Sequence, residues 1–327
     1  MEQNGEGHGE SRVAEGGSVP GVRGAAAFRL TAPHPSPIPV LIAVPHAGRA
    51  YPDSLLERMR NPGWAALRLE DRYVDLLGQR VAQQTGAALL VAQAPRAMID
   101  LNRAADDIDW GMVNGGGDHA ELEDSYSPAM HVRRASSGLG LIPRRLPGIG
   151  ELWKRRHDEA ELAARIGQIH KPYHDCLATA LAGLRARWGA ALLIDLHSMP
   201  PLLRQGGRMP PEFVVGDRFG AACGGALVAS AFGYFAEMRR LAAHNRPYAG
   251  GYVLDRHADP QGGVHAMQLE IDRSSYLDSR LAEPGKGLAA MVHLLTGLVR
   301  RLAGDVAELA RERRGDDGQG GWAEAAE

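Results

Sequence analysis

Cysteine is scarce in this sequence: Cys176 and Cys223 are the only two among 327 residues, and they share no short spacing. A disulfide framework and a cysteine-based zinc site are therefore disfavoured, and a cytoplasmic setting fits. Neither sign of charge is in clear excess, because the sequence has 37 basic and 39 acidic residues. That balance provides no general basic field for nucleic acid or anionic lipid. No apolar run approaches the roughly 20 residues that a membrane-spanning helix requires.

The two ends of the chain differ in composition from the middle. Residues 1–24 are rich in Gly, Glu and Ser and lack the basic and apolar regions of a signal peptide, so we predict a disordered leader. Residues 311–327 have the same character and predict a disordered tail. Residues 25–310 contain no internal repeat or long linker, and 44% of the sequence is hydrophobic. The middle therefore predicts a single α/β domain with a sizeable core.

Short apolar runs predict buried strands at 38–45, 88–92 and 190–196, with a shorter strand at 213–215. Between them, apolar residues recur at helical spacing. The predicted helices cover 65–85, 151–188 (one or two helices), 218–232 and about 285–310. Strands that alternate with helices predict an α/β fold, with a largely parallel sheet covered by helices on both faces.

The segment 264–273, VHAMQLEIDR, alternates between apolar and polar side chains. This period of two predicts a half-buried strand, with every second residue from Met267 to Ile271 on the apolar face. Glu270 projects from the polar face. If that face lines a cleft, Glu270 can act as a general base towards water. A solvent-facing polar stripe explains the same alternation.

Two histidines occupy equivalent places. His46 and His197 are each the first polar residue after a predicted strand, and each precedes a turn. In open α/β sheets, ligands bind outside the carboxyl ends of the strands, so two imidazoles delivered there can converge on a metal. Two ordinary structural histidines are the alternative. Asp195, on the same face of its strand as His197, is placed to orient a neighbouring group.

A catalytic zinc ion commonly has two histidines and a carboxylate as protein ligands and keeps one position open for water. The nearest candidate carboxylates lie in LEDRYVDLL at 69–77, which contains Glu70, Asp71 and Asp75. On a helix, Asp71 and Asp75 share one face. A solvated helix face without a metal is the alternative for this segment.

Two further segments contain groups that bind carboxylates. Arg103 ends the sequence DLNR, and its planar guanidinium suits a substrate carboxylate. The segment 244–252, HNRPYAGGY, is aromatic and broken by glycines, as binding loops often are. Either Arg103 or Arg246 could instead be an ordinary salt-bridge partner. HExxH, P-loop, dinucleotide-binding and GxSxG motifs are all missing from the sequence.

Taken together and in this order, six motifs resemble those of the N-formylglutamate amidohydrolase family. The resemblance runs from about Val40 to Asp278. Its carriers are VPHAGRAYP at 44–52, LEDRYVDLL at 69–77, IDLNR at 99–103, LIDLHSMP at 193–200, NRPYAGGY at 245–252 and MQLEIDRSSY at 267–276. Each motif alone is weak, whereas six in the family order make a chance resemblance improbable.

The resemblance implies a fold similar to that of zinc carboxypeptidases (phosphorylase/hydrolase-like), with a mixed, mostly parallel sheet between helices. It implies one zinc ion per chain, held by His46, Asp71 and His197. Asp71 is preferred over Glu70 because it falls where the family places its acidic residue. Glu270 is then the general base or acid. The implied substrate-binding residues are Asn102, Arg103, Asn245, Arg246 and Tyr252.

The implied reaction is hydrolysis of an N-acyl acidic amino acid, first of all N-formyl-L-glutamate to formate and L-glutamate, a step of histidine degradation. The partner is then a small molecule with carboxylates, and neither nucleic acid nor a membrane. One alternative is another zinc amidase or carboxypeptidase-like hydrolase on the same scaffold. Another is a non-catalytic protein that binds an acidic metabolite. Arg72 stands where the family commonly has an aromatic residue, and it adds a positive charge near the predicted site.

Overall fold

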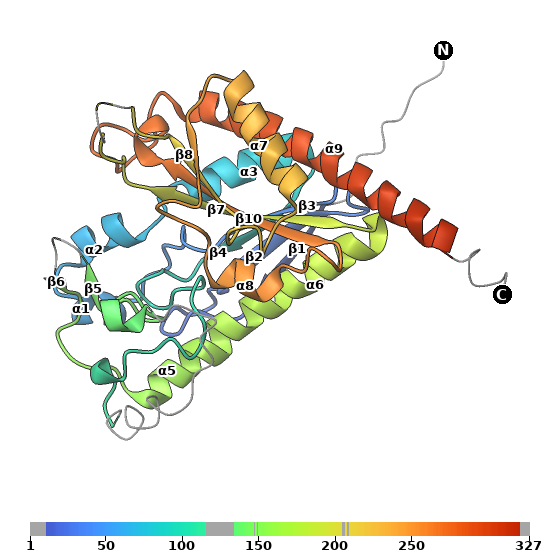
Figure 1. Ribbon diagram of the computed structural model, residues 1–327. Coiled ribbons are helices and arrows are strands. Elements are labelled where there is room, and N and C mark those ends of the chain that lie inside the picture. Colours follow the sequence, from blue (N-terminus) through green and yellow to red (C-terminus); the bar gives the residue numbers. More distant parts are fainter. Residues whose placement is uncertain are drawn as a thin grey trace, which may run out of the picture.

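A mixed sheet of eight strands forms the centre of the described part of the chain, in the order β1-β2-β4-β3-β7-β10-β8-β9 (Figure 1). The computed structural model describes residues 11–115, 134–146, 148, 150–204, 207 and 209–320. The strands are β1 (Ser11–Gly16), β2 (Phe28–Pro33), β3 (Val40–Val44), β4 (Ala88–Ala92), β7 (Ala191–Met199), β8 (Phe213–Gly216), β9 (Ala242–His244) and β10 (Val264–Asp272), and a separate short pair is β5 (Arg145–Leu146) and β6 (Gly150–Glu151).

The four central strands, β4, β3, β7 and β10, run parallel to one another. All residues of β3, β4 and β7 are buried, because helices cover both faces of the sheet. This burial explains why the strands appear in the sequence as continuous apolar runs. Outside the centre, β2 is antiparallel to β4, and β8 is antiparallel to β10. The sheet is mixed and mostly parallel, which confirms the predicted fold class.

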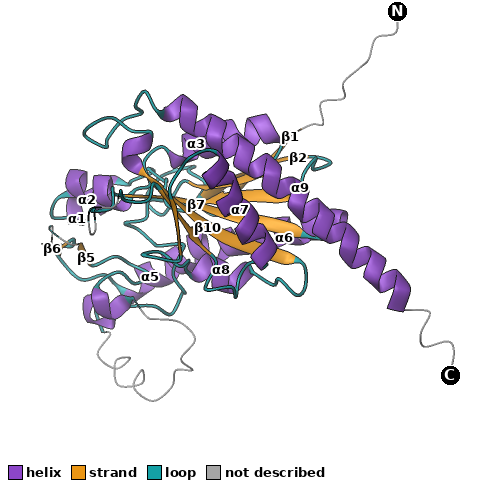
Figure 2. Cartoon of the chain, turned by 45° about the horizontal axis from the view of Figure 1, so that its top comes forward, coloured by secondary structure: helices purple, strands orange, loops and turns teal. Residues whose placement is uncertain are grey.

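Helices pack on both faces of the sheet (Figures 1 and 2). On one face, helices α3 (Val74–Thr85), α7 (Gly225–Glu237) and α9 (Leu288–Gly320) pack in the same core as Ile42 of β3, for example through Leu77 and Leu227. On the other face, Leu177 of α6 and Leu254 of α8 pack in the same core as Leu41 of β3. The helices are α1 (Asp53–Arg58), α2 (Pro62–Leu69), α3 (Val74–Thr85), α5 (Glu159–Arg165), α6 (Lys171–Trp188), α7 (Gly225–Glu237), α8 (Tyr252–His257) and α9 (Leu288–Gly320), with single turns η1 (Trp110–Met112), η2 (Ala135–Ser137), η3 (Ile166–His170) and η4 (Arg273–Ser275).

The predicted helix at 65–85 is two helices, with a break between Leu69 and Val74. Glu70 has extended backbone angles, and Tyr73 has a left-handed φ of 57°. Neither conformation continues a helix. The break puts Asp71 in a short loop, so the expectation that Asp71 and Asp75 share a face of one helix is wrong.

Both predicted disordered ends are partly ordered. Residues 11–16 form strand β1, which pairs with β2 through backbone hydrogen bonds and places Glu15 opposite Arg29. The side chains of β1 are largely exposed, which explains why the segment has no apolar signal. At the other end α9 continues through residue 320, beyond its expected end at 310. The prediction of disorder is therefore wrong for 11–24 and 311–320, and residues 1–10 and 321–327 lie outside the described residues.

Two central strands differ from their predictions in ways that affect the site. All nine residues of β10 are buried, so the expected half-buried strand is wrong: its polar face is covered by protein. β7 extends through Met199, so His197 lies inside the strand and not in a following turn. No helix in the described ranges combines the length and the apolar character needed to cross a membrane.

Candidate metal centre and active site

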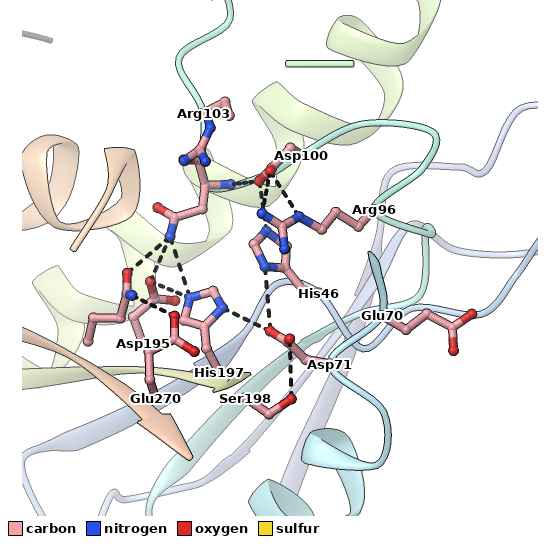
Figure 3. Close-up of polar contacts among 12 residues, drawn as sticks. His46, Glu70, Asp71, Arg96, Asp100, Arg103, Asp195, His197, Ser198 and Glu270 are labelled. Carbon is pink, nitrogen blue, oxygen red and sulfur yellow. Dashed lines mark hydrogen bonds and ion pairs between the residues drawn. The ribbon is translucent and has the colours of Figure 1, made fainter. Parts of the chain in front are cut away.

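Three buried side chains converge at the carboxyl ends of the central strands. His46 follows β3, Asp71 lies between α2 and α3, and His197 belongs to β7. One ligand atom from each lies within 4.8 Å of the others, and each residue is only 2% exposed. The two Nδ1 atoms lie 3.5 Å (His46) and 3.0 Å (His197) from Asp71 Oδ2 (Figure 3). The structure therefore brings together the three residues predicted as metal ligands.

Local backbone structure fixes two of these side chains. The Asp71 backbone N–H donates to the His46 carbonyl oxygen at 2.9 Å, which joins the loop after β3 to the break between α2 and α3. Gly48 lies against the next loop, where a Cβ atom would stand 2.1 Å from the Ala94 carbonyl oxygen. A side chain at position 48 would push the His46 loop away from its neighbour. The turn after β3 therefore requires glycine at this point.

Each histidine is held from behind by a carboxylate. His46 Nε2 lies 2.7 Å from Asp100 Oδ1, and His197 Nε2 lies 2.8 Å from Asp195 Oδ2. A carboxylate accepts hydrogen bonds, so each Nε2 carries a proton, and each Nδ1 faces Asp71, where it would offer its lone pair to a metal ion. His46 Nδ1 is buried without a hydrogen-bond partner among the described residues. Two imidazole nitrogens and one carboxylate oxygen are a donor set that suits zinc, so these residues fit the implied metal.

Arg273 and Ser198 hold Asp71 in place. Asp71 Oδ1 accepts from Arg273 Nη2 at 3.1 Å and from Ser198 Oγ at 3.3 Å. The Arg273 guanidinium is buried, and it also donates to the Glu70 carbonyl oxygen at 2.7 Å. Burial alone would raise the pKa of Asp71, but its hydrogen bond with His197 and its closeness to the two imidazoles hold that pKa well below its ordinary value. The sequence analysis missed the role of Arg273, and its place directly after β10 was the available signal.

Glu270 lies beside the cluster on β10. Its Cα is the register partner of His197 in the parallel pairing of β10 and β7, and its side chain is buried. Gln268 Nε2 donates to Glu270 Oε1 at 2.9 Å. Burial, followed by the nearby charges of Asp71 and Asp195, raises the pKa of Glu270 to about 7, although His197 and Arg96 act in the opposite direction. A carboxyl group with such a pKa can both accept and return a proton near neutral pH.

Arg96 brings a positive charge to the site, and the sequence analysis did not identify it. Its guanidinium donates to Asp100 Oδ2 at 2.9 Å, while the other oxygen of the same carboxylate holds His46 (Figure 3). Burial alone would lower the pKa of Arg96, but the negative charges of Asp100, Asp71 and Glu270 raise it. Arg96 lies in a loop four residues before Asp100, and no periodic pattern in the sequence pointed to it.

Comparisons with known proteins decide the family. The sequence profile of the N-formylglutamate amidohydrolase family matches residues 38–277. This chain belongs to that family. The N-formylglutamate deformylase of Pseudomonas putida is 30% identical over 256 residues, which make up 75% of this chain and 84% of the relative. That of Pseudomonas aeruginosa is 29% identical over 290 residues, or 84% of this chain and 95% of the relative.

The similarity extends to solved structures. The crystal structure of N-formylglutamate amidohydrolase from Ralstonia eutropha matches with a TM-score of 0.75 and 30% identity, and the match covers 88% of this chain and 99% of the other. A gene product of Agrobacterium tumefaciens matches with a TM-score of 0.56 at 16% identity, which is a likeness of fold alone. Family membership confirms the resemblance found in the sequence and makes this chain a hydrolase that acts on an amide bond.

Glu70, the alternative to Asp71, lies outside the cluster. Its side chain points away from His46 and His197 (Figure 3) and pairs with Arg72 Nη1 at 2.9 Å. Arg72 also pairs with Glu283 at 3.2 Å, so the positive charge that departs from the family pattern is shared between two carboxylates. This pairing offsets the extra charge that the sequence places near the site.

The predicted carboxylate-binding pair has two different environments. Asn102 is buried, with its Nδ2 3.2 Å from Gln268 Oε1 and its Oδ1 accepting from the Val253 backbone N–H at 3.0 Å. Its amide thus has hydrogen-bond partners within the protein through both its nitrogen and its oxygen. The guanidinium of Arg103 donates to the carbonyl oxygens of Leu139 and of Asn102. Burial, aided by the charge of Arg96, lowers the pKa of Arg103 even though Asp100 lies near it.

The remaining predicted residues belong to the segment before α8. Asn245 is buried and donates to Asp217 Oδ1 at 2.7 Å, so it holds a turn within the protein. Tyr252 begins α8, and its ring lies 5.1 Å from that of His174, with its hydroxyl accepting from Arg256. Arg246 is exposed. Asn245 and Tyr252 thus anchor the two ends of the segment 245–252 to Asp217 and to His174.

Proposed function

We propose that this protein hydrolyses N-formyl-L-glutamate to formate and L-glutamate, with one zinc ion per chain bound by His46, Asp71 and His197. The observation that carries the proposal is the geometry of the two histidines: each Nε2 is tied to a carboxylate, and each Nδ1 faces Asp71. The relatives named N-formylglutamate deformylase support the choice of substrate.

In the proposed reaction, the oxygen of water bonds to the formyl carbon while the bond between that carbon and the glutamate nitrogen breaks. A zinc ion held by His46, Asp71 and His197 would supply Lewis acidity, which lowers the pKa of water and polarises a carbonyl oxygen. Glu270 takes the proton from the attacking water and returns it to the departing nitrogen. Its place beside His197 and its raised pKa of about 7 support this role.

Positive side chains complete the proposed site. Arg96 is placed to offset the negative charge that develops on the carbonyl oxygen, because its own charge already acts on Asp71 and Glu270. Arg103 is the proposed partner of a substrate carboxylate. Burial destabilises the charged form of its guanidinium, so a carboxylate ligand would restore favourable electrostatics there. Arg246 is the proposed partner of the second carboxylate.

The test combines metal analysis with an assay for formate. Purified protein is analysed for zinc, and hydrolysis of N-formyl-L-glutamate is measured before chelation, after chelation and after zinc is restored. We expect near-stoichiometric zinc and formate release that chelation abolishes and zinc restores. Zinc without formate release would overturn the substrate, and N-acetyl and N-succinyl amino acids would then be assayed. A protein that neither binds zinc nor gains activity with it would overturn the proposed metal centre.

A further inference from the structure

The side-chain amide of Asn102 forms hydrogen bonds with two neighbouring central strands, β7 and β10. Its Nδ2 lies 3.2 Å from Gln268 Oε1 of β10 and 3.4 Å from Asp195 Oδ2 of β7. A third neighbour, His197 Nε2, lies at 3.5 Å. Gln268 and Asp195 are register partners in the pairing of β10 with β7, and all of these side chains are buried. Asn102 thus bridges two polar residues that the sheet places side by side.

The directions of these hydrogen bonds follow from the chemistry of the groups. His197 Nε2 donates to the Asp195 carboxylate, so it cannot accept a hydrogen from Asn102. The two N–H groups of Asn102 therefore go to Asp195 and to Gln268 Oε1. Because the Gln268 oxygen is taken by Asn102, the Gln268 nitrogen turns to Glu270 and donates at 2.9 Å. One chain of hydrogen bonds then runs from the partner of His197 to Glu270.

The orientation of Gln268 depends on Asn102. If the Gln268 amide turned over, its oxygen would face the ionised carboxylate of Glu270, and two acceptors would lie together without a hydrogen between them. A buried pair of this kind is unfavourable. Asn102 therefore fixes the donor that Gln268 presents to Glu270.

The first turn of helix α8 also holds the Asn102 amide in place, through the amide oxygen. Gly251, the residue before α8, has no side chain to cap the helix, and Asn102 Oδ1 accepts from the Val253 backbone N–H instead. A Cβ atom on Gly251 would lie 2.6 Å from Asn102 Oδ1, 2.8 Å from Cγ and 2.9 Å from Nδ2. The backbone of Gly251 is extended, with φ −133°, so alanine there is unfavourable only because it collides with this amide.

We propose that Asn102 is a positioning residue, which orients Glu270 relative to His197 through Gln268 and Asp195 and is itself held by Gly251. This inference rests on the proposed function for its kinetic part. It assigns Asn102 a role within the protein in place of the predicted contact with a substrate carboxylate.

The kinetic test uses Asn102→Ala, Gly251→Ala and the double variant, in the zinc-loaded full chain with N-formyl-L-glutamate. We expect Asn102→Ala to lower kcat by roughly 10- to 100-fold, as is typical for residues that support metal ligands, while KM changes far less. Gly251→Ala should lower kcat by displacing the amide. In the Asn102→Ala background the collision is absent, so Gly251→Ala should then have little effect.

A second readout is zinc affinity, measured by competition with a chelator, which does not depend on turnover. Asn102→Ala and Gly251→Ala should each weaken zinc binding, by about 10-fold, because Asp195 loses a partner and holds His197 less firmly. Thr296→Val is the matched control. The Thr296 hydroxyl is buried and donates to Gln84 of α3 at 3.0 Å, so its loss should lower stability without changing zinc affinity or kcat.

Several results would overturn the inference. One is an Asn102→Ala variant with the kcat and zinc affinity of the wild type; another is a Gly251→Ala effect of equal size in both backgrounds. A rise in KM alone would support the predicted contact of Asn102 with the substrate carboxylate. If Asn102→Ala does not fold, Gln268→Met removes the donor to Glu270 and should show the same loss of kcat. A wild type that binds zinc but releases no formate would contradict the proposed function instead, and zinc affinity would then decide the role of Asn102.

Discussion

Glu270 and His197 are register partners on adjacent parallel strands, so the proposed proton carrier and a proposed metal ligand are fixed by the same ladder of backbone hydrogen bonds. Their relative position does not depend on a loop. Asp195 and Gln268, each two residues earlier on its strand, are also register partners and lie on the same face of the sheet. The sheet therefore presents a block of four buried polar side chains, and loops supply the remaining groups.

The Glu270→Gln variant separates proton transfer from metal binding. Glutamine keeps the size of the side chain and can still accept from Gln268, but it cannot accept a proton from water. We expect zinc content to stay unchanged while kcat for N-formyl-L-glutamate falls by at least ~100-fold. Metal analysis and steady-state kinetics on the same preparation check this. Unaltered turnover would remove Glu270 from the mechanism.

The carboxylate of Asp100 should control metal affinity although it lies outside the cluster. It accepts from His46 Nε2 at 2.7 Å, and its second oxygen accepts from Arg96. Without it, His46 loses the partner that fixes its proton on Nε2, so Asp100→Ala should weaken zinc binding by about 10- to 100-fold. Asp305→Ala is a control that removes a carboxylate hydrogen-bonded to Ser230, between α7 and α9. Equal zinc affinity in both variants would show that His46 needs no such support.

Arg103 tests how the substrate is held. If its guanidinium binds a substrate carboxylate equally in the ground state and the transition state, Arg103→Ala should raise KM for N-formyl-L-glutamate by roughly 10-fold or more and leave kcat nearly unchanged. Lysine retains the charge and should recover part of the loss. A fall in kcat at constant KM would instead place Arg103 among the groups that act in the transition state.

A pair of buried histidines, His174 of α6 and His257 of α8, should make stability depend on pH. His257 Nε2 lies 2.9 Å from His174 Nδ1, and burial, then the charges of Arg256 and His170, lower the pKa of His257 to about 3. The unfolded chain, with a histidine pKa of about 6.5, binds the proton more readily than the folded chain. The free energy of unfolding should therefore fall as the pH drops from about 6.5 towards 3, by up to ~1.4 kcal/mol per pH unit for this residue.

Urea unfolding of metal-free protein at a series of pH values checks this dependence. In His257→Gln the titrating group is gone, so the curve of unfolding free energy against pH should be flatter below about pH 6.5 than that of the wild type. The metal ligands titrate in both proteins, and their contribution cancels in the difference. Parallel curves would mean that the pKa of His257 is the same in the folded and the unfolded chain.

The central strands could be predicted from the sequence because burial on both faces leaves an unbroken apolar run. The same burial misled the prediction for β10. Its alternation is real, but its polar face meets Asn102 of a neighbouring loop and not solvent. Periodicity reports which residues share a face, and it cannot report what covers that face.

The site was predicted in part. His46 and His197 follow apolar runs, but Asp71 could be preferred over its neighbour Glu70 only through the family motif, since the helix break that separates them depends on backbone angles at Glu70 and Tyr73. Arg96 lies in a loop without a periodic pattern, and Arg273, although it directly follows β10, bonds to a carboxylate, Asp71, that is distant in the sequence. Strand β1 was missed because an edge strand held by backbone pairing needs no apolar side chains.

The order of strands in the sheet also bears on when the protein becomes competent during synthesis. His46 and Asp71 are made early, but β7 lies between β3 and β10 in space, and among the described strands β10 is the last in the chain. A nascent chain leaves the ribosome from its N-terminus, so Glu270 cannot take its place beside His197 until most of the polypeptide has emerged. An incomplete chain can present His46 and Asp71 without their partners, whereas the full proposed centre arises only when the final strand docks.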